Sequence, residues 1–552
     1  MQSKSIIIII FLAVLTAFNA KAQQPSEAPA DTSDLLKPEQ IDVIKAYEPV
    51  LAKARRINVS PKLPEKAAQP EVGSQTYYSP PKSIDATFEP PELKALSAKK
   101  QSLSPVNNFW LKAGYGLRAN PLVDISGSTG LSNNINAGAQ IKYDAAKGSL
   151  ENQEHQHIMG RAFARFVAKK FNVETALKYA NQTHHYYGYN HLDVNFFKDE
   201  VRQNFSDFNI TAKLANNRNL RGNFDFLLGG DVSFLSDKNS NNNTVINLEG
   251  LGKKYFSKKY YVKAGAQLTL STNSISNENT TGFLLNINPA VFVAPAGLEV
   301  GANIGLLNNK AYIYPKIKIE KYIVKDKIAF YGGWEKWPIV NTYRNFLYWN
   351  PFLMDDVKIE NSIKEDRYIG FRGALNEQVT FNLKVKQQLV NNYAVFSSAD
   401  STFNRFQIEY DSLAKSIGIH PQVEIQVAKE ISIKVSAEIL AYNFSNVKAY
   451  HIPNYALQAG IILKTVKNLT VQGSINWADG RLVRFENPIV ENAYTPIRDK
   501  VIIDLNASAN YKISKNFDLF AEAKNILNQK YQLWNRYEAY GLQLRGGVIV
   551  KF

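Results

Sequence analysis

The sequence contains no cysteine and only 3 methionines in 552 residues. The absence of cysteine excludes disulfides, thiolate metal ligands, a catalytic thiol and a lipid-modified cysteine after a signal peptide. Beyond residue 22 the chain also lacks any run of about 18 consecutive apolar residues, so we expect no helix that crosses a membrane. Residence in a membrane would therefore require strands.

Enzyme motifs are also missing. No nucleophile elbow, zinc-protease helix, phosphate-binding loop or dinucleotide fingerprint occurs, and the glycines of "GYGLRANP" and "RGGVIV" do not precede a helix. We therefore expect a protein that is not an enzyme and binds no cofactor. The formal net charge of +16 is spread through strands and turns, so phosphorylated lipid headgroups, a pore lining or an anionic partner are better candidates than nucleic acid.

The first 105 residues fall into two segments that cannot build a core. Residues 1–22 join a basic start to an apolar run that ends in small residues at Ala20 and Ala22, which is typical of a secretory signal peptide. The alternative for this run is an uncleaved anchoring helix. Residues 23–105 are dense in proline with polar spacers, so we expect a mostly irregular, extended periplasmic segment.

Residues 106–552 show a period of two. In "VIIDLNASANYKI" (501–513) and "NLTVQGSINWA" (468–478), apolar and polar residues alternate, which predicts strands with one apolar face. Such segments run roughly 11 to 15 residues, whereas strands of soluble sandwiches average about 5 to 6 and bilayer-spanning strands need about 9 to 11. These strands are therefore long enough to cross a bilayer.

Turn lengths alternate along this part of the chain. Short turns such as "SKKY", "APAG" and "SKNF" alternate with longer connections at 186–202, 336–363, 392–410 and 482–498. That alternation is typical of bacterial outer-membrane barrels, which carry short periplasmic turns and long outer loops. We predict an all-β fold: a large transmembrane antiparallel β-barrel of about 22 strands, preceded by the proline-rich periplasmic segment.

The polar faces of these strands would line the lumen of the barrel. Basic residues on those faces would favour anionic solutes, with a solvated wall as the alternative role. The basic residues that we expect to face the lumen are Lys384, Lys386, Lys434, Lys512 and Arg545.

Two long connections hold five of the seven histidines. His155 and His157 are two residues apart and share a strand face, and Glu154 or Asp193 lies nearby in the sequence, so a metal site is conceivable. The alternative is a hydrogen-bonding aromatic rim where strands leave the bilayer, and we assign no metal ligand. The other histidines of these connections are His184, His185 and His191.

The connection at 334–363 is rich in aromatic residues. Exposed aromatic surface usually marks a contact with a partner or ligand. The alternative is a loop that folds inward and plugs its own barrel. The residues expected to make these loop contacts are Tyr343, Phe346, Tyr348, Trp349 and Phe352.

The final hairpin, residues 525–552, carries a family resemblance. An Asn-Leu-like start, an aromatic, a glycine that turns into the last strand and a closing aromatic together resemble the last hairpin of TonB-dependent outer-membrane receptors. Those positions are Asn525, Ile526, Leu527, Tyr531, Gly541 and Phe552. The resemblance implies that the barrel-assembly machinery reads the end of the last strand, at Val548, Val550 and Phe552.

The stretches "DVIKAYEPVLAKARRIN" and "FWLKAGYGLRANPLVDISGSTG" further resemble receptor-like exported proteins of the Bacteroidetes. The sequence departs from the receptor pattern before the barrel, because the proline-rich segment shows no recognisable plug domain. Asp42, Val43 and Ile44 lie in the one stretch that is similar to a TonB contact, with an extended linker strand as the alternative.

The resemblance implies a protein of the Gram-negative cell outer membrane that takes part in solute transport. The alternative is a structural or accessory subunit of an outer-membrane assembly or secretion complex. The expected partners are membrane lipid, lipopolysaccharide and the barrel-assembly machinery, with TonB or other outer-membrane subunits as further candidates.

Overall fold

The computed structural model describes residues 108–118, 120–130, 134–216, 224–257, 259–399, 405–486 and 494–552. The predicted signal peptide, the proline-rich segment and the candidate TonB contact at Asp42, Val43 and Ile44 lie outside the described residues. Those assignments therefore stay predictions. No helix in the described part of the chain is long and apolar enough to cross a membrane.

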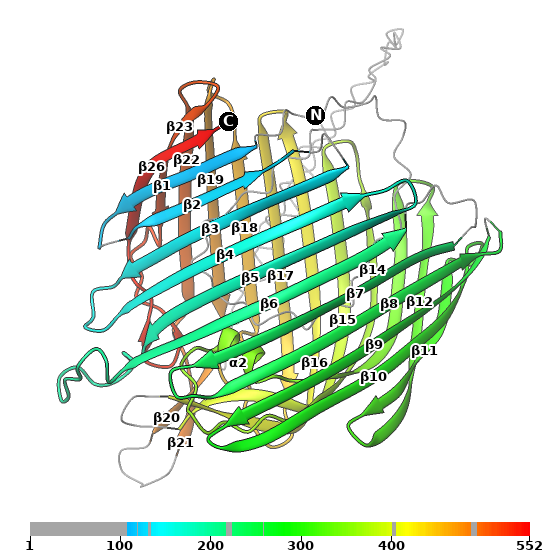
Figure 1. Ribbon diagram of the computed structural model, residues 1–552, viewed down its shortest axis with the longest axis horizontal. Helices are drawn as coiled ribbons and strands as arrows, with labels where there is room; N and C mark the ends of the chain where they lie inside the picture. Colours follow the sequence, from blue (N-terminus) through cyan, green and yellow to red (C-terminus); the bar gives the residue numbers. More distant parts are fainter. Residues whose placement is uncertain are drawn as a thin grey trace, which may run out of the picture. The chain divides into compact units, whose positions relative to one another are not determined.

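The described residues form one 22-stranded antiparallel sheet that closes on itself (Figure 1). Each strand pairs with its neighbours in the chain, and the ring closes where Trp110 of the first strand pairs with Lys551 of the last. The predicted barrel and its strand number are confirmed. The strands of the ring are β1 (Phe109–Gly116), β2 (Leu122–Ser128), β3 (Ile135–Lys147), β4 (Glu154–Val167), β5 (Phe171–His185), β6 (Arg202–Asn216), β7 (Phe224–Asp237), β8 (Asn242–Tyr255), β9 (Tyr260–Ile275), β10 (Glu278–Val293), β11 (Leu298–Leu307), β12 (Lys310–Val324), β13 (Ile328–Ile339), β14 (Ser362–Ala374), β15 (Val379–Ser398), β16 (Phe406–Ala428), β17 (Ile431–Asn443), β18 (Tyr455–Leu463), β19 (Leu469–Asp479), β22 (Ile502–Lys512), β23 (Phe517–Lys524) and β26 (Gln543–Lys551).

The two ends of the barrel differ. At the upper end in Figure 1, short turns such as 168–170 and 429–430 join the strands, and the ring begins and ends there at Phe109 and Phe552. At the lower end lie the longer connections, with helix α2 (Tyr343–Trp349) and two small hairpins. The hairpins pair β20 (Leu482–Glu486) with β21 (Tyr494–Arg498), and β24 (Gln532–Trp534) with β25 (Tyr537–Glu538).

One hairpin at the long-loop end shows how local sequence sets a connection. Ser276 and Asn277 join β9 to β10, and both have positive φ, 48° and 66°. A two-residue hairpin with both central residues in this region matches the right-handed twist of the strands, and asparagine tolerates it better than most residues. The neighbouring connections at the same end, 238–241 and 308–309, are also short, so the long connections are confined to other parts of this end.

Strand lengths vary more than the sequence indicated. β1 and β2 have 8 and 7 residues, whereas β15 and β16 have 20 and 23. The connection expected at 392–410 is present but shorter, because β15 continues to Ser398 and β16 begins at Phe406. In this stretch Ala394, Phe396 and Phe406 are buried against other loops, so the lipid-facing alternation that identified the other strands is lost.

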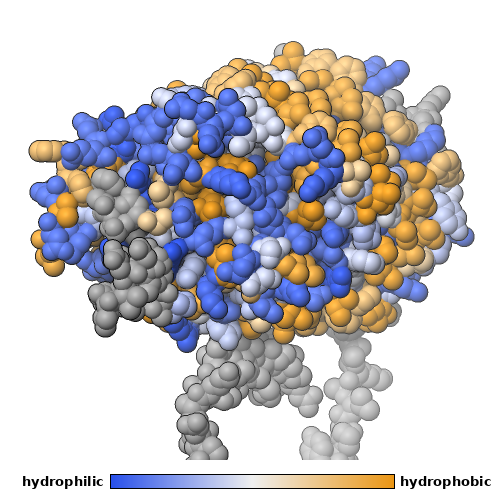
Figure 2. Space-filling view, turned by 90° about the horizontal axis from the view of Figure 1, so that it is seen from below, coloured by the Kyte–Doolittle hydropathy of each residue, from blue (hydrophilic) through white to orange (hydrophobic). Residues whose placement is uncertain are grey.

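The outward face of the wall is apolar. Large side chains such as Ile141, Ile313 and Ile417 lie exposed on it, and Ile313 keeps 75% of its surface accessible. Figure 2 views the barrel from its long-loop end and shows hydrophobic residues along the flanks, with hydrophilic residues over much of the end face. Since exposed leucine and isoleucine in such number suit hydrocarbon rather than water, the wall is that of a transmembrane barrel.

Candidate functional site

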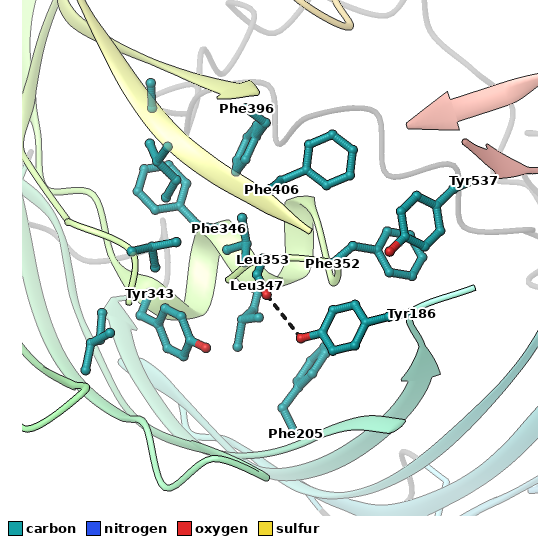
Figure 3. Close-up of a cluster of buried hydrophobic side chains, with 14 of the residues drawn as sticks. Tyr186, Phe205, Tyr343, Phe346, Leu347, Phe352, Leu353, Phe396, Phe406 and Tyr537 are labelled. Atoms are coloured by element: carbon teal, nitrogen blue, oxygen red, sulfur yellow. Dashed lines mark hydrogen bonds between the residues drawn. The ribbon is translucent and has the colours of Figure 1, made fainter. Parts of the chain in front are cut away.

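The connections at the long-loop end fold together into one structure, which we call the cap. It comprises the described residues of the connections 186–201, 340–361, 444–454, 480–501 and 525–542. The cap shares a buried hydrophobic core with the outermost ends of the strands (Figure 3). The core residues are Tyr186, Tyr187, Tyr189, Val201, Phe205, Leu235, Ile275, Tyr343, Phe346, Leu347, Phe352, Leu353, Val357, Ala394, Phe396, Phe406, Ile408 and Tyr537.

Helix α2 lies at the centre of this core. Thr342 caps its N-terminus, since the Thr342 hydroxyl accepts the Asn345 N–H at 3.1 Å. Tyr343, Phe346 and Leu347 are buried, and their spacing of three and four residues places them on one face of the helix. The helix ends at Trp349, and its C-cap Asn350 is extended because the proline that follows disfavours a helical conformation at the preceding residue.

An ion pair ties α2 to the inner wall. Arg344 donates two hydrogen bonds to the carboxylate of Asp207 on β6, from Nε at 2.8 Å and from Nη2 at 2.7 Å. The Tyr348 hydroxyl donates a third to the same carboxylate at 2.9 Å. Asp207 is only 1% exposed, so these donors compensate for its removal from water.

A second polar contact holds the first turn of α2. The Tyr343 hydroxyl donates to Asp237 Oδ2 at 2.7 Å, and the Tyr343 N–H donates to Asn273 Oδ1 at 3.0 Å. Burial, with Asp237 facing it, raises the pKa of Tyr343 well above its usual value, so the hydroxyl keeps its proton and remains a donor. The helix is thus attached to β7 and β9 as well as to β6.

The hairpin β24–β25 closes the opposite side of the cap. The rings of Phe352 and Tyr537 stack with centroids 3.7 Å apart, and Tyr187 meets Tyr537 edge-on at 4.9 Å. Trp534 packs against Phe406 and His451, with centroids 5.5 and 5.1 Å away. Aromatic side chains from four connections and β16 therefore interlock, which makes the cap one packed unit rather than a set of independent loops.

The structure places the loop residues that the sequence singled out inside this core. Tyr343, Phe346 and Phe352 are buried, and Tyr348 and Trp349 are partly buried against the same cluster. Tyr343, Phe346 and Phe352 do not form an exposed surface for a partner, because apolar side chains from other connections cover them. The inward-folded alternative describes their positions.

The basic residues predicted to face the lumen lie on the inner face of the wall. Lys384 and Lys386 alternate with Leu383 and Val385, whose side chains are exposed on the apolar outer face. Lys434 is paired across the sheet with Glu424, and Lys512 with Asp518, both close to the short-turn end. Their effect on solutes stays a prediction.

Arg545 differs from the other four. It is 5% exposed, and its guanidinium donates to Glu522 Oε2 at 2.8 Å, Asp144 Oδ2 at 2.9 Å and Asn120 Oδ1 at 3.1 Å. Lys112 of β1 also contacts Glu522, at 2.6 Å. Arg545 is therefore neutralised in a network on the inner face beside the β1–β26 junction, and its effect on solutes stays a prediction.

The histidines do not converge on one point. His155 lies 3.8 Å from Asp144 on the inner face and stacks on His184 with centroids 6.4 Å apart, and His184 in turn stacks on Phe205 of β6. His185 lies near Glu154, and His191 near the Tyr187 carbonyl at 3.0 Å. Within the described ranges no cluster of three or more metal-binding side chains occurs. These positions match the hydrogen-bonding rim.

The residues that join cap and wall were not identified from the sequence. Asp207 and Arg344 are 137 residues apart, and no local pattern links them. The segment 531–540 did carry a signal, because its aromatics Tyr531, Trp534, Tyr537 and Tyr540 are as dense as those of 334–363. Two aromatic-rich connections at the same end of a barrel could have indicated a shared core.

No family model matches this sequence, and no curated protein matches it. Solved structures do match the fold. The pyoverdine outer-membrane receptor FpvA from Pseudomonas aeruginosa is 11% identical over 81% of this chain and 79% of its own, with a TM-score of 0.61. The siderophore receptor PirA from Acinetobacter baumannii is 9% identical over 80% of each chain, also with a TM-score of 0.61.

A mutant of the ferric enterobactin receptor PfeA from Pseudomonas aeruginosa gives 10% identity over 80% of each chain and a TM-score of 0.60. The barrel thus has the fold of the TonB-dependent receptors that its final hairpin resembles. At such identities the likeness shows the fold alone. The Bacteroidetes origin and the missing plug stay predictions.

Proposed function

We propose that this protein is an outer-membrane barrel related to TonB-dependent receptors that takes part in the transport of solutes across the outer membrane and is not an enzyme. The observation that carries the proposal is the closed 22-stranded wall with an apolar outer face and a charged inner face. Such a wall needs lipid outside and accommodates polar solutes inside. Its fold neighbours support transport, since they are siderophore receptors.

The inner face favours anionic solutes. On it, Lys263 pairs with Glu299 at 2.7 Å, and Lys318 pairs with Glu335 at 2.8 Å. Lys316 lies on the same face of β12 as Lys318, and Lys384 and Lys386 continue the basic surface on β15. Because the five lysines named here outnumber the two glutamates, the local potential on this part of the wall attracts anions.

The cap would act as the outer gate. It has its own core and is held to the wall through Asp207, Asp237 and Asn273, so a solute that passes the long-loop end requires these contacts to loosen. Movement of a packed unit between two discrete arrangements is the usual basis of gating.

Conductance of the purified full-length protein in planar bilayers tests this proposal. Asp207→Ala, which frees α2, should open more often than the wild type. The double variant Lys384→Glu/Lys386→Glu should shift permeability from anions toward cations. The double variant Lys169→Glu/Lys170→Glu in the β4–β5 turn, an equal charge change away from the lumen, should leave selectivity unchanged. A barrel that is silent in the wild-type and Asp207→Ala forms would contradict transport.

A second candidate, an accessory subunit of an outer-membrane complex, rests on the connection 186–201. Leu192 and Phe197 on this connection are 94% and 82% exposed, outside the apolar belt of the wall. Exposed apolar side chains in this position suit a protein partner. A stoichiometric partner that co-purifies from native membranes, and is lost from Leu192→Ser/Phe197→Ser, would favour this candidate.

A further inference from the structure

A pocket of about 540 Å³ lies on the outer face of the wall at the long-loop end. Strands β1, β3, β4, β5 and β6 contribute to it. The residues on which the argument rests are Tyr115, Tyr143, Lys147, Glu154, His185 and Arg202. The pocket faces away from the lumen, because Tyr143 and Lys147 continue the outward face on which Ile141 lies exposed.

Cross-strand pairs on β5 and β6 show the depth at which the pocket lies. Toward the long-loop end their outward side chains change from apolar to aromatic, then to amide or hydroxyl, and last to a pair that contains Arg202. A polar ladder marks the change: Asn181 donates to Asn204 Oδ1 at 3.1 Å, and Asn204 donates to Thr183 Oγ1 at 2.8 Å. The pairs are Leu177–Ile210, Tyr179–Phe208, Asn181–Ser206, Thr183–Asn204 and His185–Arg202.

This gradient is the one that a wall meets between hydrocarbon and headgroups. The apolar pair suits acyl chains, the aromatic pair suits the interface, and the pair that contains Arg202, at the pocket, suits headgroups. The pocket therefore opens at headgroup depth on the side of the barrel that carries the long loops.

Cations predominate around the pocket. Glu154 forms an ion pair with Lys198, and Arg202 lies 3.3 Å from Asp199. Lys147 adds a further positive charge at the rim and is exposed. The pocket can therefore accept a phosphate group near Lys147 and Arg202.

His185 supplies an independent sign of a ligand. Its side chain is about 3% exposed and lines the pocket, and its Nε2 has no hydrogen-bond partner in the described part of the chain. Nδ1 lies 3.2 Å from the Glu154 carbonyl oxygen, which can only accept, so Nδ1 carries the hydrogen. Nε2 of the neutral ring is then a buried acceptor that lacks a donor, and a sugar hydroxyl would provide one.

We propose that this pocket binds the phosphorylated sugar headgroup of an outer-leaflet glycolipid. Phosphate lies near Lys147 and Arg202, a sugar hydroxyl donates to His185 Nε2, and Tyr115, which is 65% exposed, lies toward the acyl chains. The proposal rests on the outer-membrane location given in the proposed function, but it requires no transport activity.

Native mass spectrometry of the detergent-solubilised full-length protein tests the site, with a bisphosphorylated glucosamine-disaccharide lipid (lipid A) as the probe. Wild-type protein should bind it at least about 10-fold more tightly than Lys147→Glu/Arg202→Glu, which corresponds to about 1.4 kcal/mol. Lys169→Glu/Lys170→Glu, in the short turn at the opposite end of the barrel, matches the charge change and should bind like the wild type. His185→Phe keeps an aromatic ring but removes both ring nitrogens, and it should weaken binding of the probe without changing the dependence of binding on salt.

Two further probes separate the possible sources of the phosphate. Inorganic phosphate that competes as well as lipid A would reveal a free-anion site and overturn the glycolipid proposal. A phosphate-free glycolipid that binds equally would overturn it as well, and so would undiminished binding of lipid A by Lys147→Glu/Arg202→Glu. Conductance is measured on the same variants, so that the two proposals can fail separately. Loss of lipid A binding with normal conductance would overturn the lipid site and leave the proposed function intact. Binding of lipid A by barrels that do not conduct would count against transport and not against the lipid site.

Discussion

The contact between Asp207 and Arg344 should determine whether the cap stays closed. Asp207→Ala removes a carboxylate that is almost completely buried and accepts three hydrogen bonds, at 2.7, 2.8 and 2.9 Å. Breaking a buried ion pair costs about 3 to 5 kcal/mol, because the remaining charge loses its oppositely charged partner in a site with little water. The Arg344 side chain is 24% exposed and can recover some hydration, so we expect about 3 kcal/mol. That value raises the equilibrium constant for release of α2 about 100-fold.

Hydrogen exchange measures this release directly. Amides of residues 343–350 should lose protection by about two orders of magnitude in Asp207→Ala, whereas amides in the middle of β8 and β9 should keep theirs and serve as an internal reference. The double variant Asp207→Leu/Arg344→Met removes both charges and should recover much of the lost protection, since apolar residues often replace a buried pair at little cost.

Two results would refute this reasoning. Unchanged protection of 343–350 in Asp207→Ala would show that the aromatic core alone holds the cap. Loss of protection across β8 and β9 as well would show that Asp207 stabilises the whole wall rather than the cap. Migration of the unboiled protein on a denaturing gel provides a control for an intact barrel in every variant.

Three further predictions follow from other contacts. Phe552→Ser removes a ring whose centroid lies 6.0 Å from that of Phe109, and it should lower the amount of protein in outer-membrane fractions on a quantitative blot; wild-type abundance would argue against an assembly role. Tyr343→Phe leaves Asp237 without its 2.7 Å donor and should destabilise the cap by about 1 to 3 kcal/mol, seen as faster proteolysis of 340–361. Burial lowers the pKa of His451 to about 3, so the released cap takes up a proton below pH 6.5 and the closed cap does not. As the pH is lowered from about 6.5 to 3, the free energy that keeps the cap closed should fall by up to about 1.4 kcal/mol per pH unit. The rate at which a protease cleaves the cap should therefore rise with acidity in the wild type, and it should depend less on pH in His451→Gln.

The wall was predictable because its signal is local. Strand β22 (Ile502–Lys512) and strand β19 (Leu469–Asp479) begin and end within a residue or two of the segments predicted from alternation. Lipid on one side of the wall and a polar lumen on the other require successive side chains to alternate between apolar and polar along each strand. The alternation fails where the environment changes. Beyond residue 391, β15 and its partner β16 bury Phe396 and Phe406 against the cap, so an aromatic there no longer marks the lipid face.

The cap could be predicted only in part. The aromatic content of 334–363 indicated a packed loop, but its partners come from distant connections. The burial of Phe352 by Tyr537, or the pairing of Arg344 with Asp207, depends on which loops the closed ring brings together. The neutralisation of Arg545 likewise required residues from β3 and β23 that only closure places beside it.

Closure of the ring also sets a kinetic constraint on this protein. Neighbouring hairpins join residues close in sequence and can form one after another, but the junction of β1 and β26 joins opposite ends of the barrel sequence, and Lys112 bonds Glu522 across 410 residues. The entropy of closing so long a loop must be overcome before any of the contacts at that junction form. Until then both terminal strands present unpaired edges that favour aggregation in water. The rate at which β26 pairs with β1 should therefore limit how much functional barrel forms. A chaperone that protects the open sheet in the aqueous compartment would raise the yield more than any gain in the stability of a single hairpin.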